Sequence, residues 1–218
     1  MSDRTIENII VGVLAMQGGY LAHSRMLEEL LQVRTSLVRT GADLEQVDAL
    51  ILPGGESTTI IKLLMRIGLD EAIRKRVRAG MPIYGTCAGM ILLAKKVHDR
   101  PEQPTLALMD VVVERNAFGS QVDSFESDVT LDISSSESLS LLDKEVRKSA
   151  SFVRGVFIRA PYVTEIGEEV EVLGKFDDKI VAVRQKNMLA TAFHPELTSD
   201  SQFHEFFINI ILKSEEIR

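Results

Sequence analysis

The first half of the chain alternates between apolar runs and segments whose apolar residues recur at helical spacing. Continuous runs rich in aliphatic residues are typical of buried parallel strands, and they occupy residues 9–16, 48–52 and 82–84, with 35–38 as a further candidate. Amphipathic spacing predicts helices over 20–33, 60–67, 70–79 and from Cys87 to about Val97. Because parallel strands need crossover helices, the pattern predicts an α/β fold with a doubly wound, mostly parallel central sheet and helices on both faces.

The second half has shorter strand-like segments at close intervals. They cover residues 111–113, 128–133, 152–158, 170–175, 180–185 and 189–193. The last four follow one another about ten residues apart, which predicts antiparallel strands added to the sheet. The serine-rich segment 134–151 is interpreted as an exposed excursion, and 199–217 as an amphipathic terminal helix. No internal repeat or linker is apparent, so we expect a single domain over residues 1–218.

Composition restricts the classes of protein and partner. The net charge is −7 and 45% of the 218 residues are hydrophobic, which fits a soluble protein and argues against nucleic-acid binding. One cysteine cannot form an internal disulfide, which fits a reducing compartment. We see no signal peptide, and no apolar run approaches the roughly 20 residues of a membrane-spanning helix. We therefore expect a cytoplasmic protein without membrane partners, and neither a metal nor a cofactor.

The one cysteine, Cys87, lies where an apolar strand meets a helix-like run. Gly85 and Gly89 flank it at the spacing of the nucleophile elbow, with sulfur in place of the serine hydroxyl. Glycines suit a sharp strand-to-helix turn because a side chain there would clash. The turn places the thiol at a helix N-terminus, which favours the thiolate. The competing interpretation is a buried core cysteine without catalytic function.

A nucleophilic cysteine needs a base, and the base needs a residue that orients it. Among four histidines, His194 follows a predicted strand and precedes Pro195 and Glu196. If the extended geometry continues, His194 and Glu196 project to the same side, and the carboxylate fixes the imidazole tautomer. His23 is interpreted as a surface or packing residue, and His98 and His204 as structural or solvated.

Catalysis also needs donors for a developing oxyanion. Candidates are the backbone N–H of Ala88, the residue after the nucleophile, and those of Gly54 and Gly55, where glycine allows close approach. Ligands in doubly wound sheets bind beyond the carboxyl ends of the strands, so we expect the glycine-bearing loops at 17–19, 54–57 and 85–89 to converge. The predicted chemistry is acyl transfer through a thioester, and these residues alone do not name the substrate.

Several motifs together carry a resemblance to one family. The motifs GTCAG at 85–89 and HPE at 194–196 resemble the class I (triad) glutamine amidotransferases, whose sheet is flavodoxin-like. The match sharpens with LPGGESTT at 52–59, VERN at 113–116, FG at 118–119, QVDSF at 121–125, FIRAP at 157–161 and FHPEL at 193–197. As a set, they are similar to the glutaminase subunits of pyridoxal 5′-phosphate synthase. One departure is Met16 in a first-strand motif that usually reads Leu-Gln-Gly, and segment 134–151 is longer than expected.

The resemblance implies a function and its residues. Glutamine is hydrolysed to glutamate and ammonia, with Cys87 as nucleophile, His194 as base and Glu196 as its orienter. The implied glutamine-binding residues are Gly55, Glu56, Ser57, Arg115, Ile158 and Arg159. Arg115 is expected to pair with the α-carboxylate of glutamine and Glu56 with its α-ammonium.

The resemblance also implies a partner. Ammonia passes to a separate synthase subunit that makes the vitamin B6 cofactor, within a large heteromeric complex in which docking activates the glutaminase. The first helix and the Gln17 loop are candidate contact surfaces. Two alternatives remain: a glutaminase or γ-glutamyl hydrolase of another pathway, and a binding module without activity on the same fold.

Overall fold

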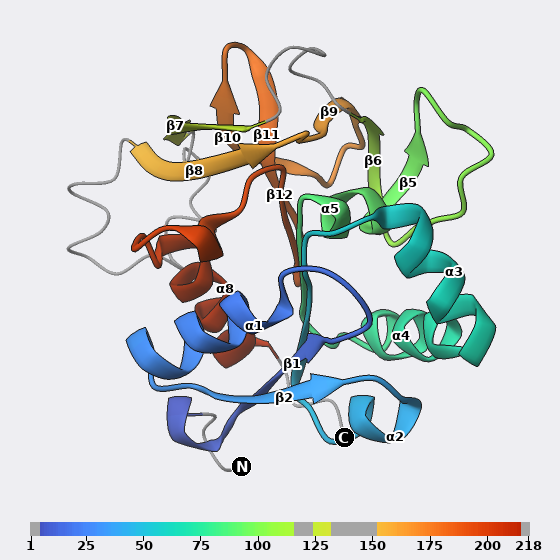
Figure 1. Ribbon diagram of the computed structural model, residues 1–218, viewed down its shortest axis with the longest axis vertical. Helices are drawn as coiled ribbons and strands as arrows, with labels where there is room; N and C mark the ends of the chain where they lie inside the picture. The colour runs from blue at the N-terminus through green and yellow to red at the C-terminus, as the bar shows by residue number, and fades with distance from the viewer. Residues whose placement is uncertain (1–4, 116–123, 132–151, 215–218) are drawn as a thin grey trace.

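The structure is a computed structural model that describes residues 5–115, 124–131 and 152–214 (Figure 1). Strands in these ranges form one twelve-stranded sheet whose main path runs β2-β1-β3-β4-β12-β11-β10-β7-β8. The first five are parallel, in the order typical of flavodoxin-like sheets. They are β2 (Arg34–Val38), β1 (Ile10–Leu14), β3 (Ala49–Leu52), β4 (Ile83–Thr86) and β12 (Met188–Thr191). The predicted fold class is therefore confirmed.

Helices cover both faces of this parallel part (Figure 1). On one face lie α1 (Tyr20–Arg25), its π-helical continuation η2 (Met26–Leu30) and α8 (Gln202–Lys213). On the other lie α3 (Ser57–Ile67), α4 (Leu69–Arg78) and α5 (Ala88–Leu93). The short elements are η1 (Ile6–Asn8), α2 (Gly41–Leu44) and η3 (Pro195–Leu197). Every residue of β3 and β4 is buried, as expected for strands with helices on both sides.

The other strands extend the sheet in antiparallel fashion, except that β5 pairs in parallel with β6. On the main path, β11 (Lys179–Gln185) pairs with β10 (Glu171–Phe176), which pairs with β7 (Ser124–Leu131), and β8 (Phe152–Ile158) follows. A branch contains β5 (Ala94–Val97), β6 (Met109–Glu114) and β9 (Tyr162–Ile166). The antiparallel additions are confirmed for β8, β10 and β11, whereas the sequence pattern did not indicate β9.

One predicted antiparallel strand belongs to the parallel part instead. β12 follows β11 through a tight connection and runs antiparallel to it, but its other edge pairs in parallel with β4. Apolar spacing marks a strand without specifying its neighbour, so the pattern could not show this. The pairing has a consequence for function, because it places the chain after β12 beside the chain after β4.

The helix predicted from Cys87 to about Val97 is wrong beyond Leu93. Carbonyl groups at its end accept hydrogen bonds from outside the helix: Leu92 O from Leu106 N at 2.7 Å, and Leu93 O from Leu108 N at 3.0 Å. The chain then continues as β5, which pairs with β6. These partners are distant in sequence, so local spacing could not anticipate them.

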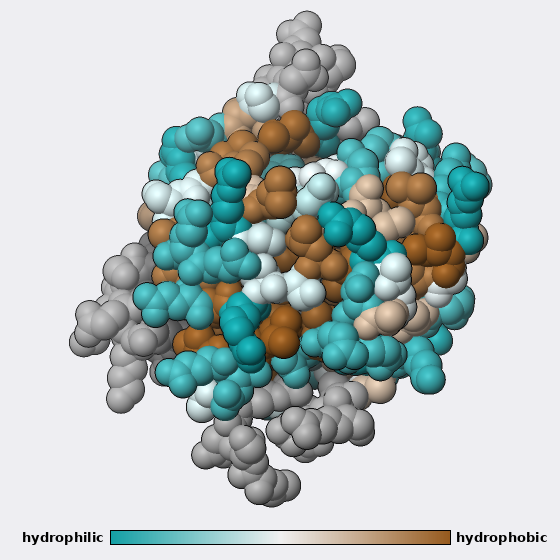
Figure 2. All heavy atoms as spheres, turned by 60° about the horizontal axis from the view of Figure 1, so that its bottom comes forward, coloured by the Kyte–Doolittle hydropathy of each residue, from teal (hydrophilic) through white to brown (hydrophobic). Residues whose placement is uncertain are grey.

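Some expectations fall partly or wholly outside the described residues. Segment 134–151 lies outside them, as do the last residues of the predicted terminal helix, of which α8 is the described part. No helix in the described ranges is long and apolar enough to cross a membrane. Figure 2 shows one face of the molecule, where polar and charged side chains divide the apolar surface into separate patches.

Candidate active site

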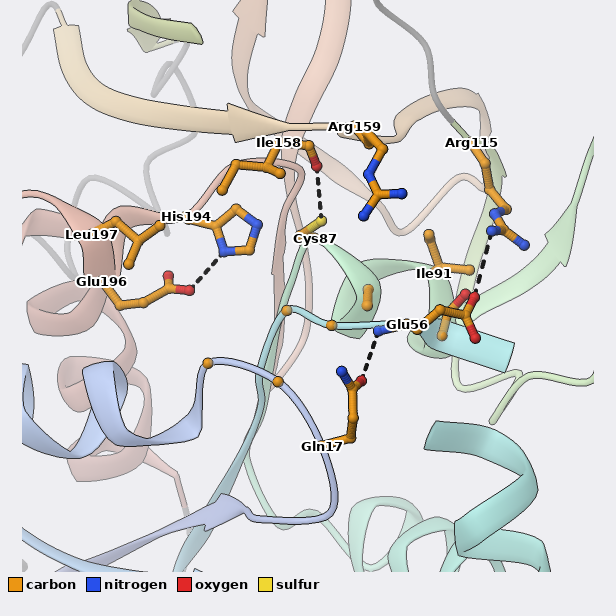
Figure 3. A pocket seen from close by; sticks show the side chains of 16 residues that line it. Gln17, Glu56, Cys87, Ile91, Arg115, Ile158, Arg159, His194, Glu196 and Leu197 are labelled. Atoms are coloured by element: carbon orange, nitrogen blue, oxygen red, sulfur yellow. Dashed lines mark hydrogen bonds and ion pairs between the residues drawn. The ribbon is translucent and has the colours of Figure 1, made fainter. Parts of the chain in front are cut away.

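The loops that follow β1, β3, β4 and β12 surround one cavity of about 420 Å³ at the carboxyl ends of the parallel strands. Its walls include the glycine-bearing loops that were expected to converge (Figure 3). The catalytic, glutamine-binding and oxyanion candidates predicted from the sequence all line it: Gly54, Gly55, Glu56, Ser57, Cys87, Ala88, Arg115, Ile158, Arg159, His194 and Glu196. The fold thus brings together residues that are up to 142 positions apart, from Gly54 to Glu196.

Cys87 sits on a tight turn between β4 and α5. Its φ of 49° and ψ of −102° lie in a region that non-glycine residues rarely adopt. A Cβ at Gly89 would lie 2.1 Å from the carbonyl oxygen of Leu52, and one at Gly85 would lie 2.5 Å from the backbone of Gly89. Both glycines are therefore required for the close packing of the turn. The backbone N–H of Cys87 donates to Thr191 O at 2.8 Å, which ties the turn to β12.

His194 and Glu196 meet directly, although not by the expected geometry. Nδ1 of His194 lies 2.7 Å from Oε1 of Glu196, and both side chains are buried. The chain does not stay extended through Pro195, because residues 195–197 form the turn η3. The backbone of His194 is held separately by its N–H, which donates to Val156 O at 2.8 Å. Figure 3 shows the imidazole between Glu196 and the cavity that holds Cys87.

Electrostatics favour charged forms in this group. Burial lowers the pKa of His194, but hydrogen bonds and charge interactions with Cys87 and Glu196 outweigh it and raise the pKa to about 10. Burial raises the pKa of Glu196, but the neighbouring His23 and His194 more than offset this and hold it well below its usual range. At neutral pH an imidazolium therefore lies between an ionised carboxylate and the Cys87 thiol.

The loop after β3 supplies the oxyanion candidates, and one of them needs correction. The Gly54 N–H already donates to Thr86 Oγ1 at 3.1 Å, so it does not point freely into the cavity. A Cβ at Gly54 would lie 2.2 Å from Cε1 of His194, so a glycine is needed there to admit the imidazole. The Gly54 carbonyl accepts from Gly19 N at 3.0 Å. The Gly54 C=O and the Gly55 N–H belong to the same peptide group, and in a trans peptide they point in opposite directions. The Gly55 N–H therefore points away from the loop that carries Gly19.

The charged wall of the cavity is a small network around Arg115. Its Nη2 lies 3.6 Å from Glu56 Oε1, and its Nη1 donates to Gln103 Oε1 at 2.8 Å. Gln103 also donates through Nε2 to the buried Ser57 at 3.0 Å. Burial raises the pKa of Glu56, but hydrogen bonds from Thr58 and Thr59 outweigh it and lower the pKa to about 2. The wall therefore presents a carboxylate and a guanidinium side by side.

Residues after β8 complete the opposite wall. The thiol of Cys87 donates to the carbonyl oxygen of Ile158 at 3.8 Å. Arg159 has a φ of 44°, a conformation that turns its guanidinium into the cavity between Cys87 and Arg115 (Figure 3). Among the described residues it has no ion-pair partner within reach. A second cation is thus available to an anionic ligand.

Sequence reasoning missed several residues of this region. Gln103 was placed in a polar loop, but it is buried and joins Arg115 to Ser57. Thr86 was recognised only as part of the elbow motif, but its hydroxyl holds the Gly54 N–H. His23 is fully buried and reaches Glu196, so of its two interpretations, surface or packing residue, the surface one is wrong, and neither anticipated the contact with Glu196. None of these roles has a local sequence signal, because each depends on contacts between distant segments.

The fold and this constellation match one class of enzyme, the glutamine amidotransferases. A crystal structure of a glutamine amidotransferase matches with a TM-score of 0.81 and 44% identity, and covers 92% of this chain and 98% of that one. PurLQS from Thermotoga maritima matches with a TM-score of 0.66 at 18% identity over 93% of this chain and 96% of that one, and it supports the fold alone.

The chain belongs to the SNO glutamine amidotransferase family, whose model matches residues 13–213. It is 53% identical over 203 residues to the pyridoxal 5′-phosphate synthase subunit PdxT of Herpetosiphon aurantiacus, which covers 92% of this chain and 99% of that protein. It is 49% identical to the subunit of the same name from Carboxydothermus hydrogenoformans, over 93% of this chain and 98% of that one.

Proposed function

We propose that this chain is the glutaminase subunit of a pyridoxal 5′-phosphate synthase and hydrolyses L-glutamine to L-glutamate and ammonia. The observation that carries the proposal is the 2.7 Å contact between His194 and Glu196 beside the Cys87 elbow, in a chain similar to PdxT subunits over nearly its whole length. Fold similarity alone would leave the substrate open, and the family match narrows it to glutamine.

The reaction begins with the thiolate of Cys87. Its sulfur attacks the side-chain carboxamide carbon of glutamine, and the carbonyl oxygen becomes an oxyanion. The His194 imidazolium donates its proton to the departing nitrogen, so ammonia leaves and a thioester remains. Neutral His194 then takes a proton from water, which attacks the thioester and releases glutamate. Glu196 accepts the hydrogen bond from Nδ1 throughout, so that the other ring nitrogen faces the reacting atoms.

Two backbone groups are proposed to hold the oxyanion. The Ala88 N–H lies at the start of α5, directly after the nucleophile. The Gly55 N–H points away from the loop of Gly19, because Gly54 O is held there, and Figure 3 places Cys87 and Gln17 on opposite sides of the chain that leads to Glu56. Preorganised donors of this kind lower the barrier most where charge develops.

The charged wall is proposed to bind the amino-acid end of glutamine. The carboxylate of Glu56 suits the α-ammonium, and the guanidinium groups of Arg115 and Arg159 suit the α-carboxylate. Because Glu56 and Arg115 lie 3.6 Å apart, a zwitterion can replace their mutual contact with one contact to each. The backbone around Gly55, Ser57 and Ile158 forms the remaining proposed contacts.

Ammonia is proposed to pass to a separate synthase subunit in a large heteromeric complex. The name of the similar PdxT proteins supports this partner, and a docked acceptor prevents protonation and loss of ammonia. We further propose that the protein acts in the cytoplasm as a single domain, without a nucleic-acid or membrane partner, cofactor or metal. Its net charge of −7 is consistent with the absence of a nucleic-acid partner.

The test is ammonia release from glutamine, with and without the synthase subunit from the same source. Cys87→Ala is expected to abolish release because no nucleophile remains, while circular dichroism and binding to the synthase subunit stay unchanged. If Cys87→Ala releases ammonia at the wild-type rate, the nucleophile assignment is wrong. If the wild-type protein hydrolyses γ-glutamyl peptides but not glutamine, the substrate assignment is wrong.

A further inference from the structure

A buried histidine lies behind the proposed triad, on the side away from the cavity. His23, on α1, has no solvent exposure and uses both ring nitrogens. Its Nδ1 lies 2.9 Å from Nε2 of His204 on α8. Its Nε2 lies 3.1 Å from Thr86 Oγ1 and 3.4 Å from Glu196 Oε1. The sequence separations of 181 and 63 residues show that tertiary packing alone assembles this group.

The direction of the proton between His23 and Glu196 follows from the neighbours. Glu196 is ionised, so its oxygens accept only, and Nε2 of His23 must carry the proton that faces it. Burial and the charge of His23 lower the pKa of His204 to about 3, so His204 is neutral at pH 7. When neutral His204 donates through its Nε2–H to Nδ1 of His23, the proton of a neutral His23 lies on Nε2, the nitrogen that faces Glu196.

One oxygen of Glu196 therefore faces imidazole nitrogens from two sides, one in a hydrogen bond and one in an ion-pair contact. Nδ1 of His194 approaches Oε1 at 2.7 Å and Nε2 of His23 at 3.4 Å. The other oxygen, Oε2, is buried without a hydrogen-bond partner among the described residues. Without His23, this buried carboxylate would depend on His194 alone. A buried charge with too few donors is costly and tends to take up a proton or to move.

His23 also reaches the loop on which the imidazole of His194 rests. Thr86 Oγ1, which His23 contacts, holds the Gly54 N–H at 3.1 Å. Gly54 in turn lies directly against His194. The same buried side chain thus touches the residue that orients the base and the residue that supports the loop beneath it.

We propose that His23 is a positioning residue for the proposed glutaminase reaction: its Nε2–H holds Glu196 from behind, and His204 holds His23. Glu196 then keeps His194 aligned with Cys87. This inference rests on the proposed function. It assigns no direct contact with substrate to His23, so its loss should reduce turnover while leaving glutamine binding largely intact.

The test compares His23→Leu, which removes the donor, with His23→Gln, whose amide can still donate to Glu196. For His23→Leu we expect kcat for ammonia release to fall roughly 10- to 100-fold, as when outer groups that orient a reactive ligand are removed, with KM for glutamine changed less than about threefold. His23→Gln should recover at least a third of the wild-type kcat. Gln46→Leu, at an exposed position away from the cavity, is the control and should leave both constants unchanged.

A second readout does not depend on glutamine. The rate at which iodoacetamide alkylates Cys87 reports its thiolate as a function of pH. In the wild type the imidazolium of His194 faces Cys87, held there by Glu196. In His23→Leu the profile should shift to higher pH, because a less firmly held Glu196 stabilises the imidazolium less. The titratable groups that face His23 are Glu196 and His204, and Tyr84 lies edge-on to His204, so His204→Asn should be measured in parallel.

The outcomes separate the inference from the proposed function. Wild-type kcat and alkylation profile in a folded His23→Leu would overturn the positioning role. If kcat falls equally in His23→Leu and His23→Gln, and in proportion to the fall in their melting temperatures, the positioning role is also overturned. His23 would then be a packing residue. If the wild type does not hydrolyse glutamine, the proposed function fails, while the alkylation profiles of the two variants still decide whether His23 acts on Cys87 through Glu196 and His194.

Discussion

At the scale of single residues, the site depends on charges that stabilise one another in a buried place. His194 and Glu196 each lose hydration on burial, which alone would favour their neutral forms. Their contact at 2.7 Å, together with the neighbouring Cys87 and His23, reverses that tendency. The protonation states of His194 and Glu196 therefore depend on the whole cluster of buried side chains and not on either residue alone.

This coupling predicts the titration of His194. The folded-state pKa of about 10 lies above the free value near 6.5. Its contribution to the free energy of unfolding is therefore fully present below pH 6.5 and is lost as the pH rises toward 10. In Cys87→Ala the midpoint should fall, because a hydrogen bond and a charge that raise it are gone. Histidine-selective NMR titration measures both midpoints, and an unchanged midpoint in Cys87→Ala would contradict the coupling.

At the scale of elements, the loop between β5 and β6 acts as a support for the charged wall. Gln103 in this loop joins Ser57, at the start of α3, to Arg115, just after β6. These segments do not adjoin in sequence, and the amide of one buried glutamine bridges them. The position of Arg115 in the cavity thus depends on a loop that supplies no direct wall residue of its own.

Gln103→Leu should therefore weaken glutamine binding. Loss of the acceptor for Arg115 and the donor for Ser57 is expected to raise KM for glutamine about tenfold, equivalent to about 1.4 kcal/mol, with a smaller change in kcat. Steady-state assays of ammonia release measure the effect. Gln46→Leu, at an exposed position away from the cavity, is the control. A KM within twofold of the wild type in a folded Gln103→Leu variant would refute the supporting role.

At the scale of the whole molecule, α1 has one face packed against the candidate active site and another exposed to solvent. Its His23 faces inward to Glu196, whereas Leu21 is 54% exposed and Leu30, in η2, is 55% exposed. Exposed large apolar side chains on one element are candidates for a protein contact. A partner bound on this helix would lie one side chain away from the residues that orient the base.

We expect Leu21→Asp to weaken binding of the synthase subunit, because a charge on this face opposes burial in an apolar contact. Affinity measured by surface plasmon resonance should fall at least tenfold, an effect of about 1.4 kcal/mol or more. Met65→Asp is the matched control, since Met65 is 51% exposed but lies on α3, across the sheet. Equal affinities for wild type and Leu21→Asp would exclude α1 as the contact surface.

Local sequence patterns were sufficient to predict most of the secondary-structure elements and the two main motifs of this protein. Apolar runs and helical spacing identified the parallel strands and their crossover helices, because burial on both faces and amphipathicity are encoded residue by residue. The glycines at 85 and 89, with the cysteine between them, likewise marked the elbow, since only a residue without a Cβ fits against Leu52 and its own turn. The HPE motif at 194–196 marked the histidine and the glutamate whose side chains meet at 2.7 Å.

Tertiary structure decided the strand neighbours, the helix ends and the buried hydrogen bonds, which local sequence patterns do not specify. It set β12 beside β4 and so brought His194 to Cys87, ended α5 through carbonyl partners in a later loop, and assigned Gly54 N–H to Thr86. It also buried His23 and placed its Nε2 3.4 Å from Oε1 of Glu196. Each of these contacts joins segments distant in sequence, and strand order, helix ends and buried hydrogen bonds depend on which partner the fold supplies. The chain by itself determined the elements and the reactive side chains, and the packing determined how they work together.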